Sequence, residues 1–242
     1  MENFQYILPE IFISVSIMLF LMVGVFKKNS ASLIYNLSNI SLVILLALII
    51  NLSSLDTVYL FNNSYLIDNL SNYMKIILVG SGIFVMLTGS KYIQVINLNK
   101  IEYPILILSS ILGMMIMISS NDLIVFYMGL ELQSLALYVL ASFNRDNLLS
   151  TESGLKYFVL SALSSGLLLY GCSLTYGFSE STNFDQILIN STEFNYGTTF
   201  GIVFILVGLA FKISAVPFHM WAPDVYQGSP TSVTLFFAIL PK

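Results

Sequence analysis

The sequence predicts an all-α polytopic membrane protein with about eight transmembrane helices. Of its 242 residues, 57% are hydrophobic and only 9% are charged, and the mean hydropathy is +0.85. A soluble domain carries roughly 25% charged residues. The apolar residues also gather into stretches of about 20, which is the helix length that crosses a bilayer. Composition and segment length together therefore place most of the chain in a membrane.

Composition also excludes several kinds of site. The net charge of −4 argues against nucleic-acid binding, which needs a basic surface. Cys172 is the only cysteine, so no internal disulfide can form. One cysteine and one histidine cannot supply the thiolates of an iron–sulfur cluster or the two axial ligands of a bis-histidine haem. If the protein serves a redox system, the electrons must travel through other chains.

Seven long apolar segments precede a shorter one. The first four are Tyr6–Phe26, Leu33–Leu52, Asn72–Val95 and Tyr103–Ser119. The first has the length of a signal peptide, but it lacks a charged leading region and an obvious small-residue cleavage site, so we expect a mature helix. The others are Asp122–Phe143, Ser153–Gly177, Thr198–Trp221 (interrupted at Pro217) and Thr231–Lys242. The stretches Asn51–Asn72, Phe178–Gly197 and Pro223–Pro230 are expected to be polar links or turns.

The loop cations predict how the chain crosses the membrane. They lie at or near the connections after odd-numbered segments, and they are Lys27, Lys28, Lys91, Lys100, Arg145 and Lys156. The links after segments two, four and six contain no Lys or Arg. Loops that face the cytoplasm or matrix carry an excess of these residues. The N-terminus is therefore predicted outside, in the intermembrane space or periplasm, although chance could also sort six cations in this way.

Glu131 is predicted to lie near the middle of the bilayer, about 14 Å from the start of the fifth segment. The spacing along the helix places three other polar side chains on the same face as Glu131, and they are Tyr127, Ser134 and Tyr138. A carboxylate facing lipid would simply be protonated, so this face should point into protein or water. The functional interpretation is a titratable group on an ion path. The structural alternative is a hydrogen bond that holds the helices together.

Lys212 is predicted at a similar depth, about 21 Å along the seventh segment. An ammonium group there costs about 3 kcal/mol, so it normally has a partner or a water-filled cavity. Pro217 lacks an N–H and its ring clashes with the preceding turn, so the helix should break just after Lys212. The freed carbonyls can then bind water, and the small residues Gly201 and Gly208 permit close approach of another helix. An inert kink is the alternative.

Three further side chains are candidates for an ion path. His219 would share the face of Lys212 if the helix resumed, and packing or capping is the other interpretation. Lys242 lies about 18 Å into the last segment and is a second lysine at mid-membrane depth. Lys156 lies near a helix start, where it could extend to the interface, and a secondary role stays open because Ser153 and Ser164 share its polar face.

Two other residues are expected to have structural roles only. Lys75 also lies close to a helix start and is predicted to extend its ammonium group to the membrane interface. Trp221 is predicted to mark that interface, where amphipathic aromatic rings are enriched.

Three motifs resemble a known family. They are Gly129–Ser134 (GLELQS), Glu152–Phe158 (ESGLKYF) and the long, specific stretch Phe211–Pro230 (FKISAVPFHMWAPDVYQGSP). They are similar to the antiporter-like membrane subunits of proton-pumping NADH:quinone oxidoreductase, respiratory complex I, and most of all to subunit 2 (subunit N in bacteria). The similarity runs over essentially the whole chain.

The resemblance implies an antiporter-like fold in two regions. Residues 1–101 would form an N-terminal three-helix region, and residues 102–242 the first antiporter-like repeat, helices 4–8, truncated within helix 8. It implies that Glu131 and Lys212 are the proton-carrying pair, that Lys242 leads toward a central hydrophilic axis and that His219 lies on that axis. No cofactor is expected in this chain, because NAD, FMN, iron–sulfur clusters and ubiquinone would be bound by other subunits.

The function implied is proton translocation coupled to NADH oxidation and ubiquinone reduction, as one subunit of that respiratory-chain enzyme. The expected partners are other membrane-arm subunits, membrane lipids and a second polypeptide that supplies helices 9–14. There are two alternatives. The chain could be a subunit of a multi-subunit cation/proton antiporter, or a structural or assembly subunit without its own proton path. Scarce alanine and abundant Ile, Asn, Phe and Tyr suit an AT-rich genome. The expected location is therefore the mitochondrial inner membrane, with the bacterial plasma membrane as the alternative.

Overall fold

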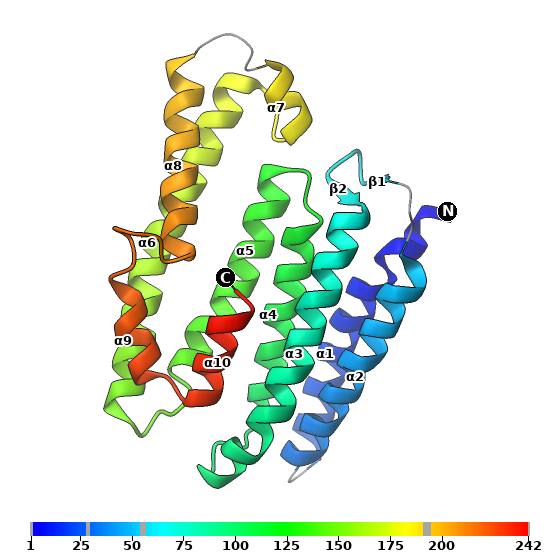
Figure 1. Ribbon diagram of the computed structural model, residues 1–242, viewed down its shortest axis with the longest axis vertical. Helices are drawn as coiled ribbons and strands as arrows, with labels where there is room; N and C mark the ends of the chain where they lie inside the picture. Colours follow the sequence, from blue (N-terminus) through cyan, green and yellow to red (C-terminus); the bar gives the residue numbers. More distant parts are fainter. Residues whose placement is uncertain (1, 28–29, 54–56, 191–194, 242) are drawn as a thin grey trace.

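Long antiparallel helices run side by side through most of the molecule (Figure 1). The computed structural model describes residues 2–27, 30–53, 57–190 and 195–241. The long helices are α1 (Leu8–Phe26), α2 (Ala31–Leu52), α3 (Asn69–Val95), α4 (Glu102–Ile118), α5 (Leu123–Ala141), α6 (Leu148–Ser179) and α8 (Tyr196–Lys212). The shorter elements are η1 (Glu2–Ile7), β1 (Val58–Leu60), β2 (Tyr65–Ile67), α7 (Phe184–Asn190), α9 (Trp221–Gly228) and α10 (Thr231–Ile239).

Each predicted apolar segment coincides with helical structure. Five helices in the described part of the chain, α1, α2, α3, α5 and α6, are long and apolar enough to cross a membrane. The apolar helices α4 and α8 have 17 residues each. Helix α10 has nine residues, which extend about 14 Å or roughly half of a bilayer. The all-α membrane architecture is confirmed. The predicted seventh segment is helical as far as Lys212, and the separate short helix α9 begins at its last residue, Trp221.

Polar side chains at the segment boundaries determine where several helices begin. Asp68 accepts a hydrogen bond from the Ser71 N–H at the start of α3, and Asp122 accepts one from Ile124 at the start of α5. Asn147 does the same for α6, which starts five residues before the predicted Ser153. Such side chains satisfy backbone N–H groups that have no partner inside the helix.

Three stretches expected to be links contain regular structure. The Asn-rich link after α2 includes the antiparallel hairpin β1–β2, in which Val58 pairs with Ile67. The polar link after α6 contains the helix α7, and the residues expected to form a turn after Trp221 form α9. Pro223 is compatible with α9 because it occupies the first helical turn, where no backbone donor is lost.

Two pairs of glycines bring helices into close contact. In the α4–α5 contact, a Cβ atom on Gly113 would lie 2.7 Å from the carbonyl oxygen of Gly129. In the α6–α8 contact, a Cβ atom on Gly171 would lie 2.7 Å from the carbonyl oxygen of Gly201. Small residues are favoured where membrane helices approach each other closely. The prediction of close approach along Gly201 and Gly208 is therefore confirmed, and the partner is α6.

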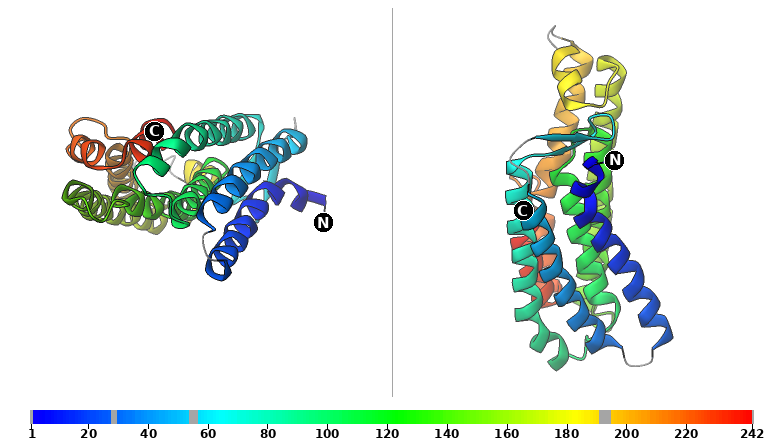
Figure 2. Two further views of the ribbon diagram at one scale, coloured as in Figure 1. Left: turned by 90° about the horizontal axis from the view of Figure 1, so that it is seen from below. Right: turned by 90° about the vertical axis from the view of Figure 1, so that its right-hand side faces the viewer.

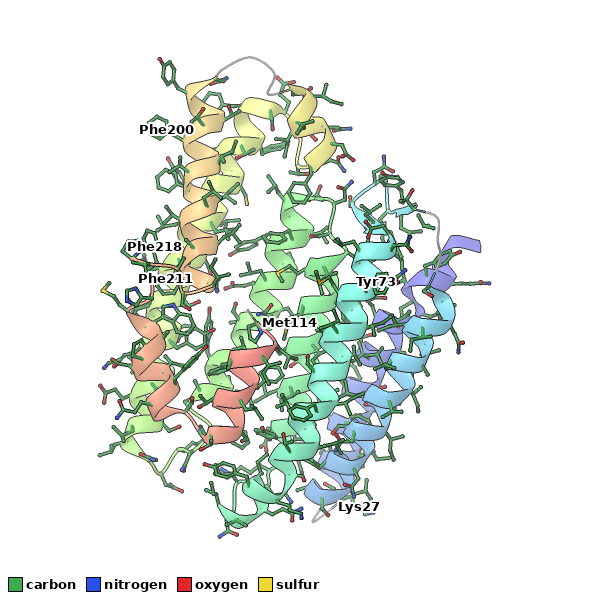
Figure 3. All side chains as sticks on the ribbon, viewed as in Figure 1. Lys27, Tyr73, Met114, Phe200, Phe211 and Phe218 are labelled. Atoms are coloured by element: carbon green, nitrogen blue, oxygen red, sulfur yellow. The ribbon has the colours of Figure 1, made fainter. Side chains whose placement is uncertain are left out.

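The α4–α5 pair lies between two groups of helices (Figure 2). The group α1, α2 and α3 lies on one side of this pair, and the group α6, α8 and α9 lies on the other (Figure 1). Lys27 lies at the end of α1 that is far from the N-terminus (Figure 3), and the connections after α3 and α5 lie at the same end. The hairpin and α7 lie at the opposite end. This arrangement leaves α8 and α9 packed mainly on α6, where the candidate site is found.

The contact between α6 and α8 predicts the effect of a single methyl group. Replacing Gly171 with Ala should lower the free energy of unfolding by about 1–3 kcal/mol, because the added Cβ overlaps the backbone of α8. Thermal unfolding of the purified chain in detergent would measure the loss. Gly166→Ala on the same helix is the matched control, since its Cβ would meet nothing within 4 Å. Equal melting temperatures for the two variants would contradict this account of the contact.

Candidate proton-transfer site

Helix α8 ends at Lys212, as the position of Pro217 predicts. The chain does not become helical again until α9 begins at Trp221. The interruption lies at the outer edge of the bundle, where Figure 3 labels Phe211 and Phe218. Lys212 therefore occupies the carboxyl end of a half-helix, and the negative end of the helix dipole lies beside its ammonium group.

Trp221 closes the interruption instead of marking the membrane interface. The residue is only 4% exposed, and its Nε1–H donates to the carbonyl oxygen of Phe211 at 3.0 Å. Its ring stacks on Tyr157, with 4.6 Å between the ring centroids. The interface prediction is wrong because the Phe211 carbonyl at the end of α8, which accepts from the Ser214 N–H within the backbone, also accepts from the indole. A buried indole N–H needs such an acceptor.

The ammonium group of Lys212 is held by hydroxyl groups. Its Nζ donates to Ser161 Oγ at 2.7 Å and to Tyr138 OH at 3.1 Å. The Tyr138 hydroxyl in turn donates to Ser161 Oγ at 2.6 Å, and Lys212 Nζ lies 5.6 Å from the centroid of the Tyr138 ring. No ion pair joins Lys212 to a carboxylate among the side chains that the structure describes.

Glu131 bonds to two other hydroxyl groups, those of Ser165 and Ser134. Its Oε2 accepts hydrogen bonds from Ser165 Oγ at 3.0 Å and from Ser134 Oγ at 3.2 Å. Ser165 lies one turn after Ser161 on α6, and its Oγ also lies 3.0 Å from the Ser161 carbonyl oxygen. Lys212 therefore bonds to the Ser161 hydroxyl and Glu131 to the Ser165 hydroxyl, and the Ser161 backbone carbonyl joins these two serines. The two charged side chains do not touch. The predicted polar face of α5 does point into protein.

A cavity of about 360 Å³ adjoins Lys212. Its polar lining comes from Lys212, Gln133, Ser134 and Tyr157, and the rest of its wall is apolar. The Oε1 atom of Gln133 is buried and has no hydrogen-bond partner among the described residues. A space of this size with several polar groups can hold water. Lys212 thus has both of the features that a buried ammonium group requires, which are polar partners and room for water.

The other predicted residues lie away from these hydroxyl groups. Lys156 is 41% exposed and pairs with Glu152 Oε1 at 2.8 Å and with Asp224 Oδ2 at 2.7 Å, which connects α6 to α9. His219 is exposed in the link between α8 and α9, so it does not share the helical face of Lys212. The condition for a shared face is not met, because the helix does not resume before Trp221.

Two further lysines singled out in the sequence are Lys242 and Lys75. Lys242 lies outside the described residues, but the preceding Pro241 lines the cavity beside Lys212. Lys75 does not extend to the interface, and that prediction is wrong. It is only 3% exposed, and its Nζ lies 2.6 Å from Glu10 Oε1, because the first turn of α1 brings a carboxylate next to it.

Ser161 and Ser165 were not predicted as site residues. The signal that could have found them is the run Ser161-Ala162-Leu163-Ser164-Ser165, which places hydroxyl groups on successive turns of an otherwise apolar helix. Among the residues that the structure describes, no group of three or more His, Cys, Asp and Glu side chains is placed to hold a metal ion.

The fold and the site define a class of multi-pass membrane protein in which a helix is broken beside a half-buried lysine. The family described as "NADH:quinone oxidoreductase/Mrp antiporter, TM" matches residues 120–242, which is more than half of the chain. The chain belongs to this family.

Curated relatives agree with this assignment. "NADH-quinone oxidoreductase subunit N" of Pelagibacter ubique is 68% identical over 244 residues, covering 100% of this chain and 51% of the relative. The protein of the same name from Rhodospirillum rubrum is 50% identical, covering 97% of this chain and 49% of the relative. The chain therefore spans about half the length of the curated relatives that it matches.

Solved structures have the same fold. A chain of respiratory complex I from Thermus thermophilus superposes with a TM-score of 0.83 at 27% identity, covering 97% of this chain and 50% of that one. A chain of the Mrp complex from Dietzia sp. gives a TM-score of 0.80 at 19% identity, covering 97% of this chain and 46% of that one. The second likeness concerns the fold alone.

The hydrogen bond that closes the interruption gives a prediction. Trp221→Phe keeps an aromatic ring against Tyr157 but removes the indole hydrogen bond to the Phe211 carbonyl, which still accepts from the Ser214 N–H. It should therefore cost about 0.5–1.5 kcal/mol of stability. Thermal unfolding in detergent checks this loss. Phe200→Leu, at an exposed position on α8, serves as the control. An unchanged melting temperature for Trp221→Phe would mean that this hydrogen bond does not stabilise the broken segment.

Proposed function

We propose that this chain is a membrane-arm subunit of respiratory complex I and moves protons through Lys212 and Glu131. The driving reaction would be NADH oxidation and quinone reduction in other subunits. The observation that carries the proposal is a half-buried ammonium group at the end of a broken helix, with a carboxylate of a neighbouring helix close by along α6. Lys212 bonds to Ser161 Oγ and Glu131 to Ser165 Oγ, and Ser165 Oγ lies 3.0 Å from the Ser161 carbonyl oxygen. The 68% identity to a relative named NADH-quinone oxidoreductase subunit N supports the coupling to that reaction.

The arrangement couples the charge of Glu131 to the proton on Lys212. A negative charge near the ammonium group stabilises it, because electrostatic interactions are strong where little water is present. If Glu131 takes up a proton or turns away, the charged form of Lys212 becomes more costly, since an isolated buried charge is expensive. A proton can then pass from Nζ toward the hydroxyls of Ser161 and Tyr138 or into the adjoining cavity.

The onward route would pass the cavity wall at Pro241 and reach Lys242 next. We assign His219 and Lys156 to more exposed parts of the path, since each lies nearer the surface than Lys212. The end of the bundle with the loop cations would face the cytoplasm, and the N-terminus would face the opposite side. Because the relatives are bacterial, we place the chain in a bacterial plasma membrane in preference to a mitochondrial inner membrane.

The proposed partners follow from the same relatives. Other membrane-arm subunits and lipids would surround the chain, and the subunits that bind NAD, FMN, iron–sulfur clusters and ubiquinone would carry the electrons. A second polypeptide would supply helices 9–14, and the alternative is that the 242 residues belong to a longer chain. Mass spectrometry of the purified complex distinguishes these cases, since it gives the length of every chain present.

A cation/proton antiporter subunit is the second candidate function. The family description includes Mrp antiporters, and the fold of an Mrp chain superposes over 97% of this chain. The two functions differ in what they need. Proton movement in complex I requires NADH and quinone, whereas exchange by an antiporter requires only a cation gradient. Co-purification with a flavin-containing arm would favour complex I. A purely structural subunit would support neither kind of transport through its own residues.

The charged pair gives the most direct test of the function. In the assembled complex in proteoliposomes, Glu131→Gln and Lys212→Met should each lower the number of protons pumped per electron, because each removes one of the two coupled charges. NADH oxidation with an artificial electron acceptor should stay unchanged, since it depends on other subunits. Lys91→Gln, at an exposed position on α3, is the control. Normal stoichiometry in both variants would contradict the proton path.

The serines of α6 give an independent prediction. Ser161→Ala should reduce proton pumping because Lys212 loses its closest hydroxyl partner, while Ser161→Thr keeps a hydroxyl and should retain most of the activity. Ser164→Ala is the matched control, since this buried serine on the same helix donates to the Gly208 carbonyl and not to a charged group. Equal pumping by Ser161→Ala and Ser164→Ala would show that the hydroxyl at position 161 has no part in proton transfer.

A further inference from the structure

A second buried cluster of ionisable side chains lies outside the Lys212 site. Lys75 Nζ lies 2.6 Å from Glu10 Oε1, and the Tyr65 hydroxyl donates to the same oxygen at 2.8 Å. Lys75 Nζ also lies 3.3 Å from the Tyr65 hydroxyl. Lys75 is 3% exposed, Glu10 6% and Tyr65 7%. Three ionisable groups therefore form a closed hydrogen-bonded cluster that water reaches poorly from the surface.

Three elements from the hairpin end of the bundle build this cluster. Glu10 lies in the first turn of α1, Lys75 in the second turn of α3, and Tyr65 begins β2. Figure 1 places the start of α1, the hairpin and the start of α3 together, and α8 with its interruption lies on the other side of the bundle. Tyr73, labelled in Figure 3, marks the same part of α3. The cluster is thus a separate site.

Two buried polar atoms beside the cluster have no hydrogen-bond partner among the described residues. One is Oε2 of Glu10, an acceptor, and the other is Nδ2 of Asn72, a donor. Asn72 lies three residues before Lys75 on α3, so it shares that face of the helix, and it is 8% exposed. A water molecule can accept from the amide and donate to the carboxylate, and buried polar groups of this kind are usually satisfied in that way.

The charge of the cluster favours water over a metal cation as the species bound there. A cation near Glu10 would face the Lys75 ammonium group, which already neutralises the carboxylate at 2.6 Å. Burial, and then the charge of Glu10, raises the pKa of Tyr65 above its usual range, so the phenol stays neutral. A neutral molecule with both donor and acceptor capacity fits this environment.

Stability alone does not explain the pair. Replacing a buried ion pair with apolar residues is often neutral or stabilising, because taking two charges out of water is costly. An ionisable residue inside a membrane segment is therefore a candidate functional group. We propose that Glu10, Lys75 and Tyr65, with water held by Glu10 and Asn72, form a second proton-binding site of this chain.

The proton step balances within the cluster. An N–H bond of the Lys75 ammonium group breaks as an O–H bond forms on Glu10 Oε1, so the ion pair becomes a neutral amine and a carboxylic acid. The site gains a proton when a hydronium ion takes the place of the bound water: an O–H bond of the hydronium breaks, an O–H bond forms on Glu10 Oε2 and a water molecule is left. The reverse step releases the proton to water, and neither step needs a metal, an oxidant or a reductant.

The ionisable surroundings of the cluster are few in the described part of the chain. Near the hairpin end they are Tyr6, Tyr59, Asp68, Tyr73, Asp122 and Asp185. Asp122 accepts from the Ile124 N–H and the Thr182 hydroxyl, and Asp185 accepts from Asn121 Nδ2. Asp68 accepts from the Ser71 N–H at the start of α3, and Tyr73 and Tyr59 are exposed. The ionisable residues of the packed helices α2 and α4 lie at the opposite end of these helices, and they are Tyr35, Glu102 and Tyr103.

Infrared difference spectroscopy of the assembled complex tests the proposal. Spectra recorded at low and high pH should contain a carbonyl band of a protonated carboxyl group that shifts on exchange into deuterated water. Glu10→Gln and Glu10→Gln/Lys75→Met should both lose this band. The double variant is included because a single change leaves one buried charge unpaired and is expected to lower assembly. Asn72→Leu should shift the band, because the bound water loses its amide partner.

Controls separate this site from the proposed pumping pair. Tyr59→Phe, at a half-exposed position on β1, should leave the band unchanged, while Tyr65→Phe should shift it. Glu131→Gln should keep the band, so a failure of the pumping role of Glu131 would leave this result standing. If no carboxyl band depends on Glu10 in a fully assembled complex, Glu10 and Lys75 are a fixed ion pair and the proposal is overturned.

Discussion

The need to stabilise an ammonium group inside a membrane explains most of the candidate site. Lys212 lies where α8 stops, and the break supplies both a dipole end and freed carbonyl groups. Trp221 donates a hydrogen bond to one of those carbonyl groups. The hydroxyls of Ser161 and Tyr138 accept from the ammonium group, and a cavity of about 360 Å³ adjoins Lys212. None of these features is needed around an apolar side chain. Together they give the ammonium group polar partners and room for water, which the proposed proton transfer would need.

Local rules of sequence predicted much of this arrangement. The apolar segments, the polar face of α5 and the break before Pro217 each depend on residues within one helix, so a single sequence contains the information. The short elements β1, β2 and α7 were missed because their few apolar residues stand among many polar ones. Ser161 and Ser165 were missed because serines in membrane helices commonly bond to the preceding turn, as Ser165 also does.

The wrong predictions share a different cause. Trp221 and Lys75 each have an amphipathic side chain that suits a membrane interface, and both are buried. Lys75 is buried against Glu10, which is distant in sequence. Trp221 is buried where it bonds to the Phe211 carbonyl, at the break in the helix. A resemblance to a family shows where its motifs lie in the sequence, but it does not show which distant residues contact Lys75 or Trp221. The family match begins at residue 120, so the Glu10–Lys75 pair lies in the region that it does not cover.

The central claim is that Glu131 and Lys212 act as one coupled unit through the serines of α6. A double-mutant cycle on protons pumped per electron tests it most directly, using Glu131→Gln, Lys212→Met and the combined variant in the assembled complex. The claim predicts that the combined variant loses no more activity than the worse of the two single variants, because either change already disables the unit. Losses that add for the two changes would mean that the residues act independently, which would contradict the account.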